Sequence, residues 1–248
     1  MSNTVGYSSK WYKKWFGEEY LQVYAHRDLD DAIQLINLIR QRLPLHRKDC
    51  ILDVACGTAR HARILSRMGY AVLGIDLSAI LLRLTRPKSS QERYPLLIRA
   101  DMCYLPFKPR FDVALSLFTS FGYFENDKQN EQVIKELAAV LKKQGKLVID
   151  FLNPGYVQNH LRPVSTQQHP QIHILEERWI EGGRVYKKIT INNDKVFIES
   201  VRLYQLDDMA EMLADNGFQI RQVYGNYQAG AFSAESERMI IMAQKNRL

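Results

Sequence analysis

Cys50-Ile51-Leu52-Asp53-Val54-Ala55-Cys56-Gly57-Thr58-Ala59-Arg60-His61 is the stretch that decides the fold. An apolar run ends in the acid Asp53, a turn with Gly57 follows, and an amphipathic pattern begins directly after the turn. This order is typical of the first strand, turn and helix of a nucleotide-binding α/β sheet. A second acid, Asp76, ends the next apolar run about 20 residues after Gly57, the distance at which an acid binds a ribose.

The apolar pattern outward from this stretch predicts strands that alternate with helices. Strands are expected at 51–54, 71–75, 96–98, 111–117 and 146–151, and helices at 28–43, 60–68, 79–84 and 127–141. Ser78 and Gly145 are suited to cap two of these helices. Such alternation implies a parallel sheet with right-handed crossovers, in which ligands bind at the carboxyl ends of the strands.

The alternation stops near Gly155. Three β-rich runs follow at 172–180, 184–191 and 196–203, separated by hairpin turns at 181–183 and 192–194, before a helix at 207–216 and strands at 218–224 and 238–243. We therefore expect a main α/β domain at 45–154 and 205–248, interrupted by an antiparallel β insertion at 155–204. The aromatic-rich start of the chain, with roughly helical spacing from Trp11 to Tyr24, predicts a helical lid within 1–44.

Composition sets wide limits on function. Lys and Arg exceed Asp and Glu by 34 to 27, a net charge of +7 that fits a basic enzyme and equally an anionic partner such as nucleic acid. No basic motif interleaved with aromatic residues is present. The three cysteines lack CxxC spacing, and no apolar stretch is long enough to span a bilayer. We expect reduced thiols, a cytoplasmic location, no membrane contact and no metal site.

The residues around Gly57 also restrict the ligand. A dinucleotide site would have a glycine-rich loop for the pyrophosphate, whereas here one glycine stands between acids that would repel phosphate. The expected ligand is a nucleoside with a positive or zwitterionic group, and a nicotinamide-dependent oxidoreductase fits poorly.

At this point the chain resembles the class I S-adenosylmethionine-dependent methyltransferases over roughly residues 45–152. The resemblance implies a Rossmann-like, doubly wound sheet of seven strands, mostly parallel with an antiparallel last strand, plus the β insertion after strand 5. The matching segments are Leu52-Asp53-Val54-Ala55-Cys56-Gly57-Thr58-Ala59, Gly74-Ile75-Asp76-Leu77-Ser78, Ala100-Asp101-Met102, Phe111-Asp112-Val113-Ala114 and Leu141-Lys142-Lys143-Gln144-Gly145-Lys146-Leu147.

The resemblance implies cofactor contacts for S-adenosylmethionine and for its product, S-adenosylhomocysteine. Asp53 would bind near the ammonium of the methionine part, and Arg27 is a candidate for its carboxylate. The backbone beside the methionine part would come from Ala55, Cys56, Gly57 and Thr58.

The nucleoside and the reacting sulfur would contact later strand ends. Asp76 would bind both ribose hydroxyls, Leu77 would pack on the adenine, Asp101 would accept from the adenine amino group, and the Met102 N–H would face the ring. The sulfonium side would be lined by Ser116, Leu117 and Phe118.

Two positions depart from known patterns. Ala59 stands where the family usually has glycine. Asn153-Pro154-Gly155-Tyr156 is similar to the Asn-Pro-Pro-Tyr motif of amino-group methyltransferases of nucleic acid, but follows the fifth strand and lacks the second proline. We interpret that segment as a turn.

A methyltransferase of this kind would catalyse in-line attack on the sulfonium methyl, mainly by alignment and exclusion of water. An amine needs at most a weak base and a hydroxyl a stronger one. His61 is expected on an inward helix face as a hydrogen-bonded, half-buried residue. Candidate bases, each of which also fits a structural role, are Tyr7, Tyr20, Tyr123, His160, His169 and His173.

The lid and the insertion are similar to those of small-molecule methyltransferases, such as glycine and aminosugar N-methyltransferases. The first hypothesis is therefore methyl transfer to nitrogen or oxygen of a small molecule, by a monomer or homodimer. RNA or protein as the acceptor is the alternative, and a cofactor-binding protein without transferase activity is an alternative of another class.

Overall fold

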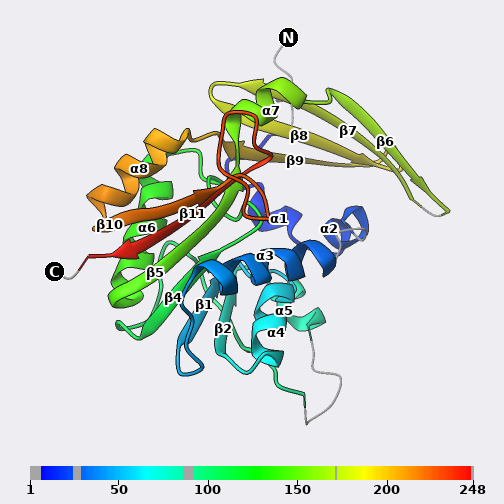
Figure 1. Ribbon diagram of the computed structural model, residues 1–248. Coiled ribbons are helices and arrows are strands. Elements are labelled where there is room, and N and C mark those ends of the chain that lie inside the picture. Colours follow the sequence, from blue (N-terminus) through cyan, green and yellow to red (C-terminus); the bar gives the residue numbers. More distant parts are fainter. Residues whose placement is uncertain (1–6, 25–28, 86–91, 171, 247–248) are drawn as a thin grey trace.

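The fold was analysed in a computed structural model that describes residues 7–24, 29–85, 92–170 and 172–246. Its main sheet has the strand order β10-β11-β5-β4-β1-β2-β3 (Figure 1). β11 runs antiparallel to both of its neighbours, and the other six strands share one direction. The predicted Rossmann-like sheet is confirmed. Its strands are β1 Cys50–Val54, β2 Ala71–Asp76, β3 Leu96–Arg99, β4 Phe111–Ser116, β5 Leu141–Leu152, β10 Phe218–Tyr224 and β11 Arg238–Lys245.

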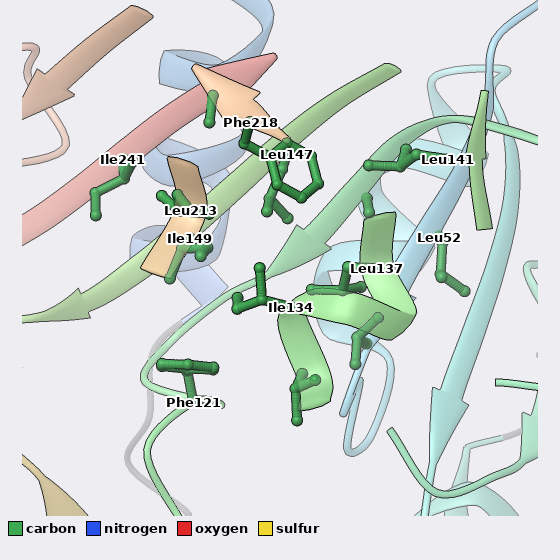
Figure 2. Close-up of a cluster of buried hydrophobic side chains, with 14 of the residues drawn as sticks. Leu52, Phe121, Ile134, Leu137, Leu141, Leu147, Ile149, Leu213, Phe218 and Ile241 are labelled. Carbon is green, nitrogen blue, oxygen red and sulfur yellow. The ribbon is translucent and has the colours of Figure 1, made fainter. Parts of the chain in front are cut away.

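Helices cover the main sheet on both faces, which explains the nearly continuous apolar runs of its strands. Successive side chains of β5 point to opposite faces: Leu147 and Ile149 pack in one hydrophobic cluster, shown in Figure 2, and Val148 packs in the other. The first cluster includes α6 Asp127–Val140 and α8 Leu206–Asp215. The second includes α3 Leu29–Arg42 and α4 Arg60–Arg67.

The insertion forms a separate four-stranded antiparallel sheet in the order β6-β7-β8-β9. Its strands are β6 Val164–His169, β7 Ile172–Glu181, β8 Arg184–Ile191 and β9 Lys195–Arg202. Sequence analysis missed β6, because this edge strand is mostly polar and its cross-strand hydrogen bonds do not require apolar side chains.

The interpretation of residues 153–156 as a turn is wrong, because α7 Pro154–His160 begins there. Asn153 caps this helix by accepting a 3.2 Å hydrogen bond from the Gly155 N–H, and proline at the first helical position suits the start of a helix.

The aromatic start of the chain forms two short helices, α1 Tyr12–Trp15 and α2 Glu18–Val23, with Gly17 between them. Buried side chains of this segment, including Trp11, Trp15 and Val23, pack in one cluster with Ile174 and Ile189 of the insertion sheet. The N-terminal helices and the insertion therefore share one hydrophobic cluster.

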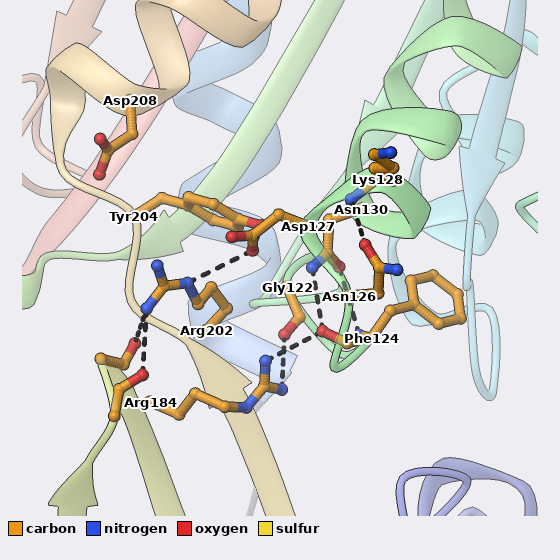
Figure 3. Close-up of polar contacts among 12 residues, drawn as sticks. Gly122, Phe124, Asn126, Asp127, Lys128, Asn130, Arg184, Arg202, Tyr204 and Asp208 are labelled. Atoms are coloured by element: carbon orange, nitrogen blue, oxygen red, sulfur yellow. Dashed lines mark hydrogen bonds and ion pairs between the residues drawn. The ribbon is translucent and has the colours of Figure 1, made fainter.

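Arg184 of β8 ties the insertion to the main domain. Its buried guanidinium donates to the carbonyl oxygens of Gly122 and Phe124, at 3.2 and 2.9 Å (Figure 3). It also donates to the Ser200 hydroxyl at 2.7 Å. Among the described residues, no helix has the length and apolar composition needed to cross a bilayer.

We expect Arg184→Met to lower the free energy of unfolding by about 3 kcal/mol, because several buried oxygens would lose their charged donor. Urea denaturation followed by circular dichroism measures this change. Arg202→Met is the matched control, since Arg202 is more exposed and its ion pair with Asp127 is 3.3 Å long; its cost should stay below about 1 kcal/mol. Equal losses in the two variants would contradict the anchoring role of Arg184.

Candidate functional site

A cavity of about 910 Å³ opens at the carboxyl ends of the parallel strands. This volume is near the upper end of the range of roughly 300–1,000 Å³ for small-molecule sites. Its walls come from the loops after β1, β2, β3 and β4, from the N-terminal helices, and from α7 and the insertion sheet. The cavity thus lies where the main domain, the aromatic start of the chain and the insertion meet.

The turn after β1 brings the backbone close to the cavity. Ala55, Gly57 and Ala59 have φ values of 53°, 58° and 55°, in the left-handed region that favours glycine. The preference of the family for glycine at the position of Ala59 therefore has a conformational reason. In this chain the Ala59 methyl group is fully buried, which offsets part of the strain of the positive φ. The Cys56 N–H donates to the Ile75 carbonyl oxygen at 2.9 Å, which holds the turn against β2.

Asp53 is the penultimate residue of β1 and is only 1% exposed, although it lines the cavity. The backbone N–H of Ala62 in α4 donates to its carboxyl group, but Oδ2 has no hydrogen-bond partner among the described residues. Burial raises the pKa of Asp53 to about 7, and the neighbouring Asp76 adds to the rise. This buried oxygen therefore needs a donor that the described part of the protein does not supply.

Asp76 ends β2 and organises the neighbouring loops. Its Oδ2 accepts from the Gly57 N–H and its Oδ1 from the Ser78 N–H, both at 2.7 Å. Burial raises the pKa of Asp76, and these backbone hydrogen bonds oppose the rise. Ser78 caps α5 Ala79–Leu84, and its hydroxyl donates to the Phe16 carbonyl oxygen at 2.6 Å. A carboxylate has about four acceptor sites, so Asp76 keeps acceptor capacity for a ligand.

The next strand ends complete this wall. Asp101 and Met102 follow β3, and the Cys103 N–H donates to Asp101 Oδ1 at 2.9 Å. Phe118 follows β4 with a φ of 56° and lies under the Arg60 guanidinium, 4.1 Å from the ring centroid. The predicted cofactor contacts that line the cavity are Asp53, Ala55, Cys56, Gly57, Thr58, Asp76, Leu77, Asp101, Met102, Leu117 and Phe118.

Two predicted cofactor contacts are not among these. Ser116 is buried within β4 and does not line the cavity. Arg27 lies outside the described residues.

The candidate bases divide in the same way. Tyr20, Tyr123 and His160 line the cavity, whereas Tyr7 and His173 do not. His61 also lines it, but it is buried rather than half-buried, and its Nε2 has no hydrogen-bond partner among the described residues. Burial lowers the pKa of His61 to about 3, so it is neutral at physiological pH.

Sequence analysis missed the group that fixes Phe118. The fully buried Asp150 of β5 accepts from the Phe118 N–H at 2.9 Å, from Arg238 Nε at 2.8 Å and from the Tyr227 hydroxyl at 3.0 Å. No motif marks these residues, because they come from three distant segments that only the sheet brings together. The only sequence signal was Asp150 itself, an acidic residue within an otherwise apolar run of the strand.

Arg178, Lys187 and Glu199 of the insertion also line the cavity and were not predicted. The sequence signal for them is a charged residue at the inward position of an otherwise apolar alternation. Within the described residues, no group of three or more His, Cys, Asp or Glu side chains has the arrangement of a metal site.

Comparisons with known proteins agree with this geometry. Residues 51–145 match the family model described as a methyltransferase domain. This chain is 26% identical to YqeM of Bacillus subtilis (strain 168), which is named as a methyltransferase. The match covers 94% of this chain and 96% of YqeM.

Two solved structures share the fold over nearly their whole length. One is an S-adenosylmethionine-dependent methyltransferase from Clostridium acetobutylicum, with a TM-score of 0.80, 20% identity, and coverage of 92% of this chain and 98% of the other. The second is the sugar N-methyltransferase KedS8 from Streptoalloteichus, with a TM-score of 0.70, 21% identity and coverage of 93% and 94%. With its strand-end cavity and its matched domain at residues 51–145, the chain is a methyltransferase, and it shares the fold of S-adenosylmethionine-dependent methyltransferases.

Proposed function

We propose that this enzyme transfers the methyl group of S-adenosylmethionine to a nitrogen or oxygen atom of a small molecule. The observation that carries the proposal is the placement of Asp53, Asp76 and Asp101 on one wall of a single 910 Å³ cavity, which continues from the strand ends to the insertion. Acids at the ends of adjacent parallel strands suit a nucleoside with a cationic end.

The residues of this wall fit the groups of the cofactor. Asp53 Oδ2, buried and without a partner among the described residues, suits the ammonium of the methionine part. The remaining acceptor sites of Asp76 suit the ribose hydroxyls. Leu77, Asp101 and Met102 would bind the adenine, and Leu117 and Phe118 would lie beside the sulfonium. Arg27 stays a proposed contact of the cofactor carboxylate.

When bound, S-adenosylmethionine supplies an electrophilic methyl group. Transfer would form the bond from the acceptor atom to the methyl carbon as the carbon–sulfur bond breaks, and the electron pair of the broken bond would stay on sulfur in S-adenosylhomocysteine. The protein would contribute alignment and exclusion of water, which can lower the barrier by several kcal/mol. Tyr20, Tyr123 and His160 line the cavity and remain candidates for taking a proton from the acceptor.

The acceptor would bind between the cofactor, the N-terminal helices and the insertion. Trp11, Phe16, Tyr20 and Tyr123 line that side and make close ring contacts, with Trp11 and Tyr123 centroids 5.2 Å apart. Segment 1–44 would act as the lid and 155–204 as the acceptor wall, in a monomer or a homodimer. The shared fold of KedS8, a sugar N-methyltransferase, supports a small acceptor.

We expect Asp76→Ala to weaken S-adenosylhomocysteine binding by about 1–3 kcal/mol, the range for a lost hydrogen bond to a charged group. Titration calorimetry measures the affinity. Asp112→Ala is the matched control, because Asp112 also accepts a backbone hydrogen bond, from the Cys50 N–H, but lies at the opposite ends of the strands. Unchanged binding in Asp76→Ala would remove Asp76 from the site.

We expect the affinity for S-adenosylhomocysteine to fall about tenfold per pH unit below pH 7, because a proton on Asp53 would prevent its ion pair with the ligand ammonium. Since burial raises the folded-state pKa above the unfolded value, Asp53 makes the ligand-free protein less stable as pH rises from about 4 to 7. Titration calorimetry between pH 5 and 8 tests this linkage. Below pH 7, a plot of log affinity against pH should have a slope of about one, which corresponds to one proton. Asp53→Asn should flatten the profile; an unchanged slope in this variant would assign the titration to another group.

A further inference from the structure

The face of the insertion sheet toward the cavity carries a row of three charged residues. Arg178 of β7 pairs directly with Lys187 of β8, and Lys187 pairs with Glu199 of β9. Side chains alternate between the two faces of a strand, so these three lie on one face. The next row on one side consists of Ile180, Val185 and Val201. The next row on the other side consists of Glu176, Ile189 and Phe197.

Like charges directly opposite each other destabilise a sheet, so the Arg178–Lys187 pair requires an explanation. Glu176, 3% exposed, supplies part of it: its Oε2 accepts a hydrogen bond from Arg178, and its Oε1 forms an ion pair with Lys187 Nζ at 2.7 Å. Although burial raises its pKa, the two cations lower the pKa of Glu176 to about 2. Ser165 closes the cluster by donating to Glu176 at 3.0 Å and accepting from Arg178 at 2.9 Å. One buried carboxylate thus holds two cations at the cavity wall.

Glu199, the third member of the row, has its carboxylate engaged by the N-terminal helices. Trp15 Nε1 donates to Oε1, and the Tyr24 hydroxyl lies 2.8 and 2.9 Å from the two oxygens. Lys187 Nζ in turn donates to the Tyr24 hydroxyl at 2.6 Å. The acid of the row therefore holds the aromatic helices in place, whereas Arg178 and Lys187 present positive charge to the cavity that they line.

Charged side chains line both walls of the cavity. Asp53, Asp76 and Asp101 lie at the strand ends, where Arg60, Arg99 and Arg238 also line the cavity. Arg178 and Lys187 lie with Glu199 on the wall made by the insertion. A cationic cofactor would bind at the first wall. A molecule that fills the remaining space would reach the second wall with the end that faces away from the sulfonium.

We propose that Arg178 and Lys187 form an anion subsite that binds a carboxylate or phosphate group of the methyl acceptor and thereby points its other end at the cofactor. This inference rests on the proposed function and narrows the acceptor to an anionic small molecule. An arginine offers paired N–H donors that match either oxyanion, and a lysine adds a point charge.

The test uses the full chain saturated with S-adenosylhomocysteine, titrated at low ionic strength with inorganic phosphate and, in a second arm, with acetate. Phosphorus and proton NMR measure binding, which we expect with a Kd on the order of 1 mM for at least one anion. The anion that binds more tightly identifies the acceptor group as phosphate or carboxylate. Lys187→Gln and Arg178→Gln should each weaken binding at least about tenfold, or 1.4 kcal/mol.

Lys188→Gln is the matched control, because it removes the same charge from the next residue, which points to the opposite face and pairs with Glu177 at 2.7 Å. It should leave anion binding unchanged. The affinity for S-adenosylhomocysteine, measured on every variant, shows whether the variant is folded and binds the cofactor product, independently of anion binding. The side chain introduced by Lys187→Gln can still donate to Glu176, and Arg178→Gln provides a second variant. Normal cofactor-product binding without anion binding, or equal weakening in Lys188→Gln, would overturn the subsite and leave the proposed function standing.

Discussion

The carboxylate of Asp76 is the interaction on which the rest of the site depends. It fastens the turn after β1 through the Gly57 N–H and the start of α5 through the Ser78 N–H. Ser78 then reaches Phe16, so the N-terminal helices are connected to the same point. A single strand-end acid therefore positions two loops of the main domain and one edge of the cavity, and any ligand at Asp76 contacts a group already held in place.

Desolvation governs the chemistry of the cavity walls in two different ways. Asp53 is buried, and its Oδ2 has no hydrogen-bond partner among the described residues, so desolvation raises its pKa although Arg60 opposes the rise. Glu176 is buried next to two cations and stays ionised. The first carboxyl group responds to a ligand, whereas the second is a permanent support for its neighbours. Two carboxyl groups with similarly low solvent exposure thus differ in role, because in the described part of the chain only Glu176 has cations in direct contact.

Most of the fold could be predicted from the sequence, because local rules agree with the tertiary structure there. The Val133, Ile134 and Leu137 stripe fixes α6, and strand-end acids mark the cavity wall. The rest could not. β6 lacks an apolar alternation, and Asn153 caps a helix in a segment that resembles a turn motif. The positive φ of Ala59 could not be predicted, because alanine rarely adopts this conformation. The pairing of Arg178 with Lys187 depends on strand register across a long hairpin.

The joint between the N-terminal helices and the insertion has a consequence for the order of folding. Trp15 and Tyr24 contact Glu199 across 184 and 175 residues of sequence. Closing such long loops is entropically slow, and during synthesis these contacts cannot form until the ribosome has passed Glu199. Because the ribosome adds about 5–20 residues per second, Glu199 is synthesised roughly ten seconds or longer after Trp15. The first aromatic residues to be made are therefore among the last to reach their native partners, and the strand-end wall can assemble before the wall opposite it exists.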